Sequence, residues 1–407
     1  MNLDVYIFDS LAGQLSNDGG SLRFSYDAEY SRRDDAIALS VNLPLAAETF
    51  GNRESLAYFA NLLPEADFRE STARALGISS GNDFALIAEL GRDCAGAVVL
   101  LPSGGGAIGD HMSPRELSED DLARELAALT EQRGFLDGHD LTRMSLAGAQ
   151  TKLAVIVDGE AMALPRDWRD PTTHILKPEP QRFGHLVANE HFCMRLARAC
   201  DLQVAEASAE VTTAGLPYLC VTRFDRGPLR PRRLHQEDFC QALGVLPDHK
   251  YQAEGGPTVA DEVELLDRHS AVPARDKLAL WRALVFNYLI GNCDAHAKNY
   301  SLLYESVKPS LAPLYDLVST AVYDGLTERM ASSIGEAKEL ADVARESFEE
   351  EAARCGLNVS AAIRQVDQLA AVTRSAAAGL AERDEHASPI IGEIIEGIEI
   401  RAQRVLR

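Results

Sequence analysis

Apolar residues recur along the first part of the chain with a period of two and then of three to four, which predicts short strands followed by helices. Apolar runs at residues 3–8 and 22–27 flank the polar stretch SNDGGS, whose glycines tolerate positive φ, so we expect a β-hairpin. Residues 55–76 have a helical pattern that breaks at a proline, and residues 82–102 predict a helix, a glycine turn and a strand. These elements predict a small β-rich N-terminal subdomain over residues 1–102.

The middle of the chain alternates predicted strands and helices after a glycine- and serine-rich linker at residues 103–116. A helix with an acidic first turn, which suits the helix dipole, begins at Ser118. Residues 186–202 place apolar side chains at helical spacing between the last two strands of this part, which we assign to residues 103–225. The predicted strands cover residues 151–159, 173–180 and 216–226.

Helical periodicity dominates the C-terminal part of the chain. In the stretch DKLALWRALVFNYLIGN, Gly291 is well placed to end a helix. After residue 336, three further stretches are alanine-rich, charged and helical in pattern. We therefore expect residues 226–407 to form an α-helical C-terminal lobe of an α+β protein. The apolar positions that predict the first of these helices are Leu278, Trp281, Val285 and Tyr288.

The composition adds limits on compartment and partners. The chain has 407 residues, 46% of them hydrophobic, and a formal net charge of −22. A surface of that charge repels a phosphate backbone, so binding of nucleic acid would need a local basic patch or a basic partner. Seven scattered cysteines without a C-x-x-C pair argue against a disulfide framework and a zinc ribbon and favour the reducing cytoplasm. The N-terminus lacks a standard export signal, and the longest apolar stretch is too short to span a bilayer.

The stretch GNCDAHAKNYSLLYE at residues 291–305 concentrates polar side chains between a helix and an apolar run. Asp294 and Asn299 stand five residues apart, which is the spacing of the proton-accepting Asp and metal-binding Asn in the catalytic loop of protein kinases. Taken alone, the pair is also typical of a turn capped by its own Asp and Asn side chains. Asp316, 17 residues beyond Asn299, adds the second carboxylate that a magnesium–ATP site needs.

Two residues upstream occur in the order that the same chemistry requires. Lys177 lies on a predicted strand and Glu190 on the following helix, like the phosphate-binding Lys of a kinase and the Glu that orients it. Glu190 near the start of a helix is also explained by the helix dipole alone. His296 suggests a zinc ligand, but no second His or Cys lies at ligand spacing on an obvious common face, so a place beside a nucleotide is the better interpretation.

Two basic clusters and one polar stretch admit a structural explanation. The basic clusters are most simply solvated loop and helix ends, with contact to DNA or substrate as the alternative. The stretch LHQEDFCQALGV predicts a polar turn that opens an amphipathic helix with Phe239 and Leu243 turned inward. The clustered arginines are Arg230, Arg232 and Arg233 in LRPRRL, and Arg401, Arg404 and Arg407 in the tail.

A series of motifs resembles the HipA family of bacterial serine/threonine kinases, the toxins of HipA–HipB type II toxin–antitoxin modules. In order, they are SLAGAQTK, HILKPEP, NEHFCMRLA, VTRFDR, LHQEDFCQALGV, KYQAEGGP, GNCDAHAKNYSLL and PLYDLVS. The N-terminal stretches LPLAAETF, FANLLPE and GRDCAGAV are similar to that family too, so the resemblance covers nearly the whole chain. It implies a two-lobed protein-kinase-like fold with a small β-rich N-terminal subdomain and an α-helical C-terminal lobe.

The resemblance implies an enzyme that uses ATP and Mg²⁺ to phosphorylate a protein. In known members the substrate is an aminoacyl-tRNA synthetase such as the glutamyl enzyme, and growth halts. The implied partner is a HipB-like helix-turn-helix antitoxin, which would supply most contacts to operator DNA in the cytoplasm. Two rival interpretations remain: a small-molecule phosphotransferase of the aminoglycoside-kinase kind, and a catalytically idle co-repressor.

Roles for single residues follow from the same resemblance. Asp294 is expected to be the catalytic base, and Asn299 and Asp316 the magnesium ligands. Lys177 would contact the α- and β-phosphates, and Ser145 matches the autophosphorylated serine whose modification shuts off the kinase. The remaining nucleotide contacts are expected from the loop Ala147, Gly148, Ala149, Gln150, Thr151 and Lys152, the hinge Thr222, Arg223 and Phe224, and the pocket residues His296, Ala297, Lys298 and Tyr315.

The chain departs from related patterns at two places. Thr222 stands where a hinge Glu can occur, although backbone contacts can make that side chain dispensable. The stretch YDLVS replaces the D-F-G of eukaryotic kinases. Neither departure removes a residue that phosphoryl transfer requires.

Overall fold

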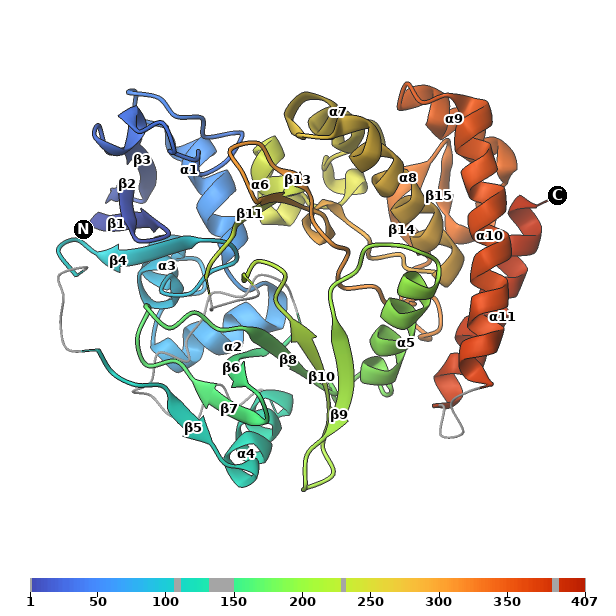
Figure 1. The fold of residues 1–407 in the computed structure, drawn as a ribbon, viewed down its shortest axis with the longest axis horizontal. Helices are drawn as coiled ribbons and strands as arrows, with labels where there is room; N and C mark the ends of the chain where they lie inside the picture. The colour runs from blue at the N-terminus through green and yellow to red at the C-terminus, as the bar shows by residue number, and fades with distance from the viewer. Residues whose placement is uncertain (1, 106–110, 132–149, 228–231, 383–387, 407) are drawn as a thin grey trace. The chain divides into compact units, whose positions relative to one another are not determined.

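The chain folds into two compact units, whose helices and strands are drawn in Figure 1. The computed structural model describes residues 2–105, 111–131, 150–227, 232–382 and 388–406. Unit 1 comprises residues 1–181, 210–247 and 303–308, and unit 2 comprises residues 182–209, 248–302 and 309–407. Most of the two predicted parts at residues 1–102 and 103–225 therefore lies in unit 1. The division of the chain into three domains stays a prediction.

A four-stranded antiparallel sheet in the order β3-β2-β1-β4 begins unit 1. The predicted hairpin is wrong in its pairing, because a strand that the sequence pattern did not indicate, β2, lies between the two predicted ones. The glycine turn joins β2 to β3, with φ of 60° at Gly19 and 93° at Gly20, while a turn of equal length joins β1 to β2 and begins at Phe8, whose φ is 56°. The strands are β1 (Asn2–Ile7), β2 (Ser10–Asp18), β3 (Ser21–Tyr26) and β4 (Val98–Pro102).

Helices pack against this sheet and close its core. The predicted break at Pro64 is confirmed, since one helix ends before it and the next begins after it. Leu3, Val5 and Ile7 alternate toward the core and are fully buried, as the period of two along β1 predicts. The elements are η1 (Tyr30–Arg32), α1 (Asn52–Phe59), η2 (Ala60–Leu62), α2 (Ala66–Leu76) and α3 (Asp83–Leu90).

A six-stranded sheet in the order β5-β7-β6-β8-β10-β9 forms the second layer of unit 1. Helix α4 (Glu119–Thr130) follows Ser118, the predicted helix start, which caps it, and the helix packs its leucines against Leu153 and Val155 of this sheet. Strand β8 carries Lys177 as predicted, paired with Leu219 of β10. The strands are β5 (Arg115–Leu117), β6 (Leu153–Asp158), β7 (Ala161–Leu164), β8 (His174–Pro178), β9 (Ala207–Val211) and β10 (Pro217–Thr222).

The stretch that the sequence predicted as a polar turn is a buried strand, β11 (His235–Asp238), followed by α6 (Phe239–Leu243). Glu237 is fully buried and accepts hydrogen bonds from the Ser40 hydroxyl, the Val41 N–H and the Tyr304 hydroxyl. Burial raises the pKa of Glu237 to about 7. The prediction failed because these partners lie far from Glu237 in the sequence, and they are what makes a buried carboxyl group tolerable.

Unit 2 is mainly helical, in agreement with the predicted C-terminal lobe. Helices α10 and α11 lie side by side, and both contact α8 (Figure 1). Trp281, Val285 and Tyr288 are buried as predicted, whereas Leu278 is 46% exposed, because a local pattern does not tell how far neighbouring elements cover a helix. The helices are α5 (Leu186–Ala199), α7 (Val259–His269), α8 (Pro273–Ile290), α9 (Arg345–Arg354), α10 (Val359–Ala381) and α11 (Pro389–Val405).

Short elements complete the fold and connect the helices of unit 2. Within the described residues, no helix has both the length and the hydrophobicity that crossing a bilayer requires. The remaining strands are β12 (Ser301–Tyr304), β13 (Ser310–Leu311), β14 (Arg329–Ile334) and β15 (Ala337–Glu339), and the short 3₁₀ turns are η3 (Pro247–His249), η4 (Gln252–Glu254), η5 (Ala297–Asn299) and η6 (Leu340–Asp342).

Candidate active site

Helix α8 ends at Gly291, directly before the predicted catalytic loop. Gly291 has a φ of 73°, a backbone conformation that favours glycine, and a Cβ there would lie 2.9 Å from the Arg401 guanidinium carbon and would displace that side chain. Arg401 donates from Nε to the Leu289 carbonyl oxygen at 2.8 Å and satisfies one of the last carbonyls of α8. The interpretation of Arg401 as a solvated tail residue is therefore wrong, since it is 9% exposed.

The loop after α8 brings Asp294 and Asn299 together. The Asn299 side-chain amide donates to the Asp294 carbonyl oxygen at 3.0 Å, and the His296 N–H donates to the same oxygen at 2.8 Å. The Asp294 N–H donates to Asn292 Oδ1 at 3.1 Å, which holds the start of the loop. The Asp294 side chain itself is 54% exposed. A carboxylate that is fixed by its backbone and open to solvent is accessible to a reacting group.

Tyr251 is a contact of Asp294 that the sequence did not identify. Its hydroxyl donates to Asp294 Oδ1 at 2.6 Å, and its ring lies edge-to-face with His296 at 5.2 Å between centroids. The Nε2 atom of His296 lies 4.0 Å from the same carboxylate oxygen, and the Lys250 ammonium lies 5.3 Å from the centre of the Tyr251 ring. The motif KYQAEGGP pointed to this segment by resemblance, but nothing in it indicated a contact to a residue 43 positions away.

A buried polar chain extends from the loop into the core of unit 2. Asn292 donates to Asn287 Oδ1 at 2.9 Å, and Asn287 donates to the Tyr300 hydroxyl at 3.1 Å. Burial, together with the charge of Glu262, raises the pKa of Tyr300, so its hydroxyl stays protonated. This series of hydrogen bonds connects the backbone of Asp294 to buried side chains of unit 2, which hold the start of the loop in place.

Tyr315 and Asp316 lie in a segment that is tied to the same loop. The Tyr315 hydroxyl donates to the Lys298 carbonyl oxygen at 2.7 Å and lies 2.7 Å from the Ser301 hydroxyl. Asp316 has a φ of 53°, a left-handed conformation that is uncommon outside glycine. A strained backbone conformation persists only where the surrounding structure holds it in place, and such residues are frequent at functional sites.

Asn189 on α5 is a second residue without a predicted role that supports this segment. It is fully buried, accepts from the Ser319 N–H at 2.8 Å and donates to the Ser319 carbonyl oxygen at 2.9 Å. This paired contact fixes the backbone three residues after Asp316. Glu190, the next residue of α5, is 1% exposed, which is unusual for a carboxylate whose only role is to favour a helix dipole.

The other predicted contacts lie in unit 1. Lys177 on β8 and Lys152 before β6 are 5% and 7% exposed, and Thr222 ends β10 with its hydroxyl 3.2 Å from His174 Nε2. The Arg223 side chain forms buried ion pairs with Asp93 and Asp225, so only the backbone of Arg223 is expected to contact a nucleotide. Ser145, Ala147, Gly148 and Ala149 lie outside the described residues, whereas Gln150 and Thr151 are half-buried. Lys177 and Glu190 belong to different units, so the orienting role of Glu190 stays a prediction.

The chemistry of the unit 2 residues fits a magnesium ion. Asn299 and Asp316 offer an amide oxygen and a carboxylate, which are the hard oxygen ligands that Mg²⁺ prefers. Among the described residues there is no group of three or more His, Cys, Asp or Glu side chains that could hold a metal. Two protein ligands suit an ion that completes its shell with nucleotide phosphates and water.

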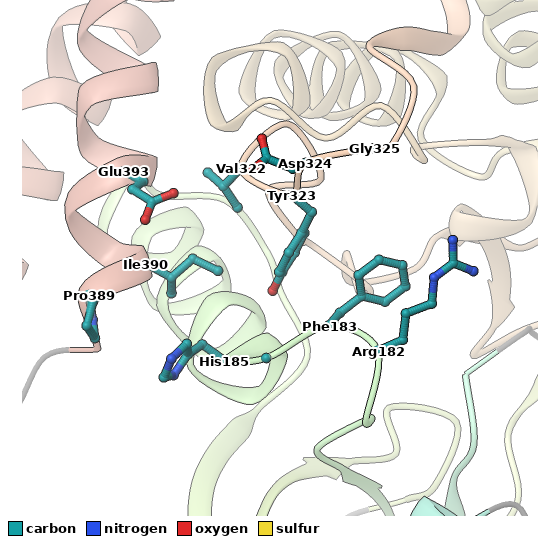
Figure 2. Close-up of a pocket in the computed structure, with 11 residues that line it drawn as sticks. Arg182, Phe183, His185, Val322, Tyr323, Asp324, Gly325, Pro389, Ile390 and Glu393 are labelled. Atoms are coloured by element: carbon teal, nitrogen blue, oxygen red, sulfur yellow. The ribbon is translucent and has the colours of Figure 1, made fainter.

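A separate cavity of about 520 Å³ opens on unit 2 (Figure 2). The Arg182 guanidinium lies 5.0 Å from the centre of the Phe183 ring, and that ring lies 5.4 Å from Tyr323. His185 at the start of α5 and Glu393 on α11 line the same cavity. None of its lining residues belongs to the predicted phosphotransfer site.

Models of two protein families match the chain. The HipA N-terminal domain matches residues 3–101, and the HipA-like C-terminal domain matches residues 144–377. The chain belongs to the HipA family. The C-terminal HipA match contains every predicted site residue of both units, and the N-terminal match covers the four-stranded sheet except for Asn2 and Pro102 at its ends.

Two curated relatives are similar to most of the chain. The serine/threonine-protein kinase toxin HipA of Shewanella oneidensis is 32% identical over 82% of this chain and 78% of its own length. Y4mE of Sinorhizobium fredii, whose name as a kinase is provisional, is 43% identical over 93% of this chain and 92% of its own length. Similarity of this extent places the chain among HipA-family proteins that are named as kinases.

A solved HipA structure confirms the predicted α+β, two-lobed protein-kinase-like fold. HipA in the complex of Shewanella oneidensis HipA, HipB and operator DNA matches with a TM-score of 0.86 and 27% identity. The match covers 99% of this chain and 97% of that one, so the N-terminal sheet and the C-terminal helices both belong to the shared fold.

Proposed function

We propose that the protein is a serine/threonine protein kinase toxin of a type II toxin–antitoxin module, which transfers the γ-phosphate of ATP to a protein. The observation that supports this most is the state of Asp294, which is held by its backbone, hydrogen-bonded by Tyr251 and 54% exposed at its side chain. A base that must reach a hydroxyl on the surface of another protein needs both a fixed position and access.

Each residue in the mechanism positions or neutralises a group. Asp294 accepts or orients the proton of the substrate hydroxyl, and Tyr251 restricts the carboxylate to one orientation. Lys177 binds the α- and β-phosphates, and the backbone around Thr222 meets the adenine. Magnesium held by Asn299 and Asp316 would neutralise charge on the phosphate oxygens when it is bound.

Substrate and partners are proposed on the same basis. We expect the phosphorylated protein to be an aminoacyl-tRNA synthetase such as the glutamyl enzyme, in the cytoplasm. A HipB-like helix-turn-helix antitoxin would bind this acidic chain and carry most contacts to operator DNA, because a net charge of −22 disfavours direct contact with phosphates.

Incubation of the purified protein with labelled ATP, magnesium and a cell lysate tests the proposal. The expected result is a label on serine or threonine of one main protein, absent when a chelator removes magnesium. A label that appeared on aminoglycosides but never on protein would favour the small-molecule phosphotransferase instead. Growth arrest that persisted in the Asp294→Ala variant would favour the idle co-repressor.

Replacing Tyr251 by Phe should lower kcat about three- to tenfold, since a hydrogen bond to an exposed carboxylate orients it at a modest energetic gain. The KM for ATP should stay unchanged, because the hydroxyl contacts the base and not the nucleotide. Steady-state kinetics with the labelled substrate measure both values, and Tyr6→Phe in unit 1 serves as the matched control. An unchanged kcat in Tyr251→Phe would show that Asp294 needs no such support.

Autophosphorylation at Ser145 is a further expected property. The wild-type protein incubated with ATP and magnesium should gain one phosphate, and Ser145→Ala should gain none there. A phosphate of about −1.5 to −2 charge beside the ATP phosphates should then weaken ATP binding by repulsion. Intact-mass spectra and peptide mapping measure the modification. A wild-type protein that phosphorylates its substrate but itself gains no phosphate would contradict the assignment.

A further inference from the structure

Five charged side chains are buried together in unit 1. They form what we call the buried ion cluster, with three arginines against two aspartates and no side chain more than 6% exposed. Asp93 comes from the segment between α3 and β4, whereas the other four follow β10. The members are Asp93, Arg223, Asp225, Arg226 and Arg233.

Asp93 is the centre of one half of the cluster. Its Oδ1 accepts from Arg226 at 2.8 Å and from Arg233 at 3.2 Å. Its Oδ2 accepts from both the N–H and the hydroxyl of Thr172, at 3.1 Å and 2.7 Å, and lies 3.6 Å from the Arg223 guanidinium. The expectation that Arg233 is a solvated loop residue is therefore wrong, because its partner Asp93 lies 140 positions away in the sequence.

Asp225 is the centre of the other half. It accepts two hydrogen bonds from Arg223, at 3.0 Å and 2.8 Å, and a third from the Gly96 N–H at 2.6 Å. Arg223 also donates to the Cys94 carbonyl oxygen at 2.8 Å. Gly96 has a φ of 77°, and a Cβ there would lie 2.7 Å from the Gln236 nitrogen, so the two segments meet too closely for any side chain.

The charges of the cluster depend on one another. Burial alone would raise the pKa of Asp93, but the guanidinium groups of Arg226, Arg223 and Arg233 outweigh burial and hold that pKa below its ordinary value. Burial lowers the pKa of Arg226 to about 10, with Arg223 adding to the effect. Loss of either aspartate would leave buried positive charge without compensation, which is far more costly than loss of an exposed ion pair.

The cluster connects three segments that the proposed function places around a nucleotide. Residues 93–96 belong to the part that matches the HipA N-terminal domain. Thr172 precedes β8, which carries Lys177, and residues 223–226 follow Thr222 at the end of β10. The Arg223 N–H donates to the Thr173 carbonyl oxygen at 2.9 Å, so the hinge backbone is held on the side of β8 as well.

We propose that the HipA N-terminal domain positions the adenine-binding hinge through this cluster, and that Asp93 is the positioning residue. The inference rests on the proposed function, in which the backbone around Thr222 meets the adenine. A hinge that the N-terminal domain already holds in place is ordered before ATP binds. Binding then costs less conformational entropy, and the affinity for ATP is higher.

The test compares Asp93→Asn with Asp35→Asn, which removes a carboxylate from an exposed ion pair of the same domain. In Asp93→Asn the KM and the calorimetric Kd for ATP should rise about tenfold, as expected when positioning groups are displaced, while kcat changes less than about threefold. A merely structural role would lower the folded fraction, and thus kcat, at an unchanged KM. Asp35→Asn should leave both values as in the wild type.

Two further variants keep the test independent of folding. Thr172→Val removes two hydrogen bonds of the cluster but no charge, and should raise the KM for ATP by a smaller factor. Arg233→Gln added to Asp93→Asn restores the net charge of the cluster and should recover part of the ATP affinity. An ATP affinity unchanged in both Asp93→Asn and Thr172→Val would overturn the inference. A folded wild-type protein that binds no ATP would overturn the proposed function itself.

Discussion

Replacing Asp294 by Asn should lower the rate of phosphate transfer about 10²–10⁴-fold, the range expected for loss of a general base. Binding of ATP should survive, because the amide keeps the shape of the side chain and the predicted nucleotide contacts lie on other residues. Single-turnover transfer and ATP titration by calorimetry measure the two quantities separately. The effect should exceed that of Tyr251→Phe, since Tyr251 acts only by orienting this carboxylate.

The matched control is Asp342→Asn, which alters an exposed carboxylate in the same unit and should leave transfer unchanged. Asp294→Asn that abolished nucleotide binding but still turned over bound ATP would assign the residue to the nucleotide site instead. A normal rate of phosphate transfer in Asp294→Asn would exclude Asp294 as the general base.

Replacing Glu262 by Gln should stabilise the protein at alkaline pH and leave its stability almost unchanged at pH 5. Burial, with the charges of Asp261 and Glu351 adding to it, raises the pKa of Glu262 to about 8. Because the folded state holds this proton more tightly than the unfolded state, the stabilising contribution is full below about pH 4.5 and is lost as the pH rises through about 8. Each unit of pKa shift corresponds to about 1.4 kcal/mol, so the loss reaches several kcal/mol.

Thermal unfolding from pH 5 to pH 9 measures this difference. The midpoint of the wild type should fall relative to Glu262→Gln as the pH rises, because only the wild type has to bury a charge at this position. Glu264→Gln on the same helix is the control, since Glu264 forms an exposed ion pair with Arg268 and should show no such dependence. If the unfolding midpoints of the wild type and Glu262→Gln changed with pH in parallel, the pKa of Glu262 would not be raised by burial, and its carboxylate would be in contact with solvent when ionised.

The elements that carry the predicted site residues were predictable from sequence where a local pattern determines the backbone. A strand bearing Lys177 and a helix bearing Glu190 were predicted from periodicity alone, and both elements exist. The end of α8 at Gly291 was predicted because a left-handed residue closes a helix and glycine adopts that conformation without strain. Asp294 and Asn299 follow from the spacing, since the loop that joins them is short enough to close on itself.

Other predictions failed where burial depends on distant partners. The stretch around Glu237 was predicted as a polar turn, because nothing nearby indicates the hydroxyl groups of Ser40 and Tyr304 that bond its carboxyl group. Arg401 was predicted as a solvated tail residue, although it satisfies a carbonyl oxygen of α8. A charged residue can be buried when the fold brings it an oppositely charged or hydrogen-bonding partner. The residues next to it in the sequence do not indicate whether such a partner will be there.

The sequence by itself predicted the α+β class, the order of the elements proposed to bind phosphate, and Asp294, Asn299 and Asp316 as the candidate phosphotransfer residues. These predictions depend on short-range periodicity, turn chemistry and spacing, which neighbouring residues encode, whereas the two-lobed kinase-like fold was predicted from the resemblance to the HipA family. Only the tertiary structure decided that Tyr251 bonds Asp294 and that Asp93 reaches the arginines beyond β10. Those contacts join residues 43 and 133 positions apart, so no local pattern encodes them. Asp93 and Arg226 pair because folding removes both from water and leaves each as the group that can satisfy the other, whereas Tyr251 meets the exposed carboxylate of Asp294 because the fold of unit 2 brings their two segments together.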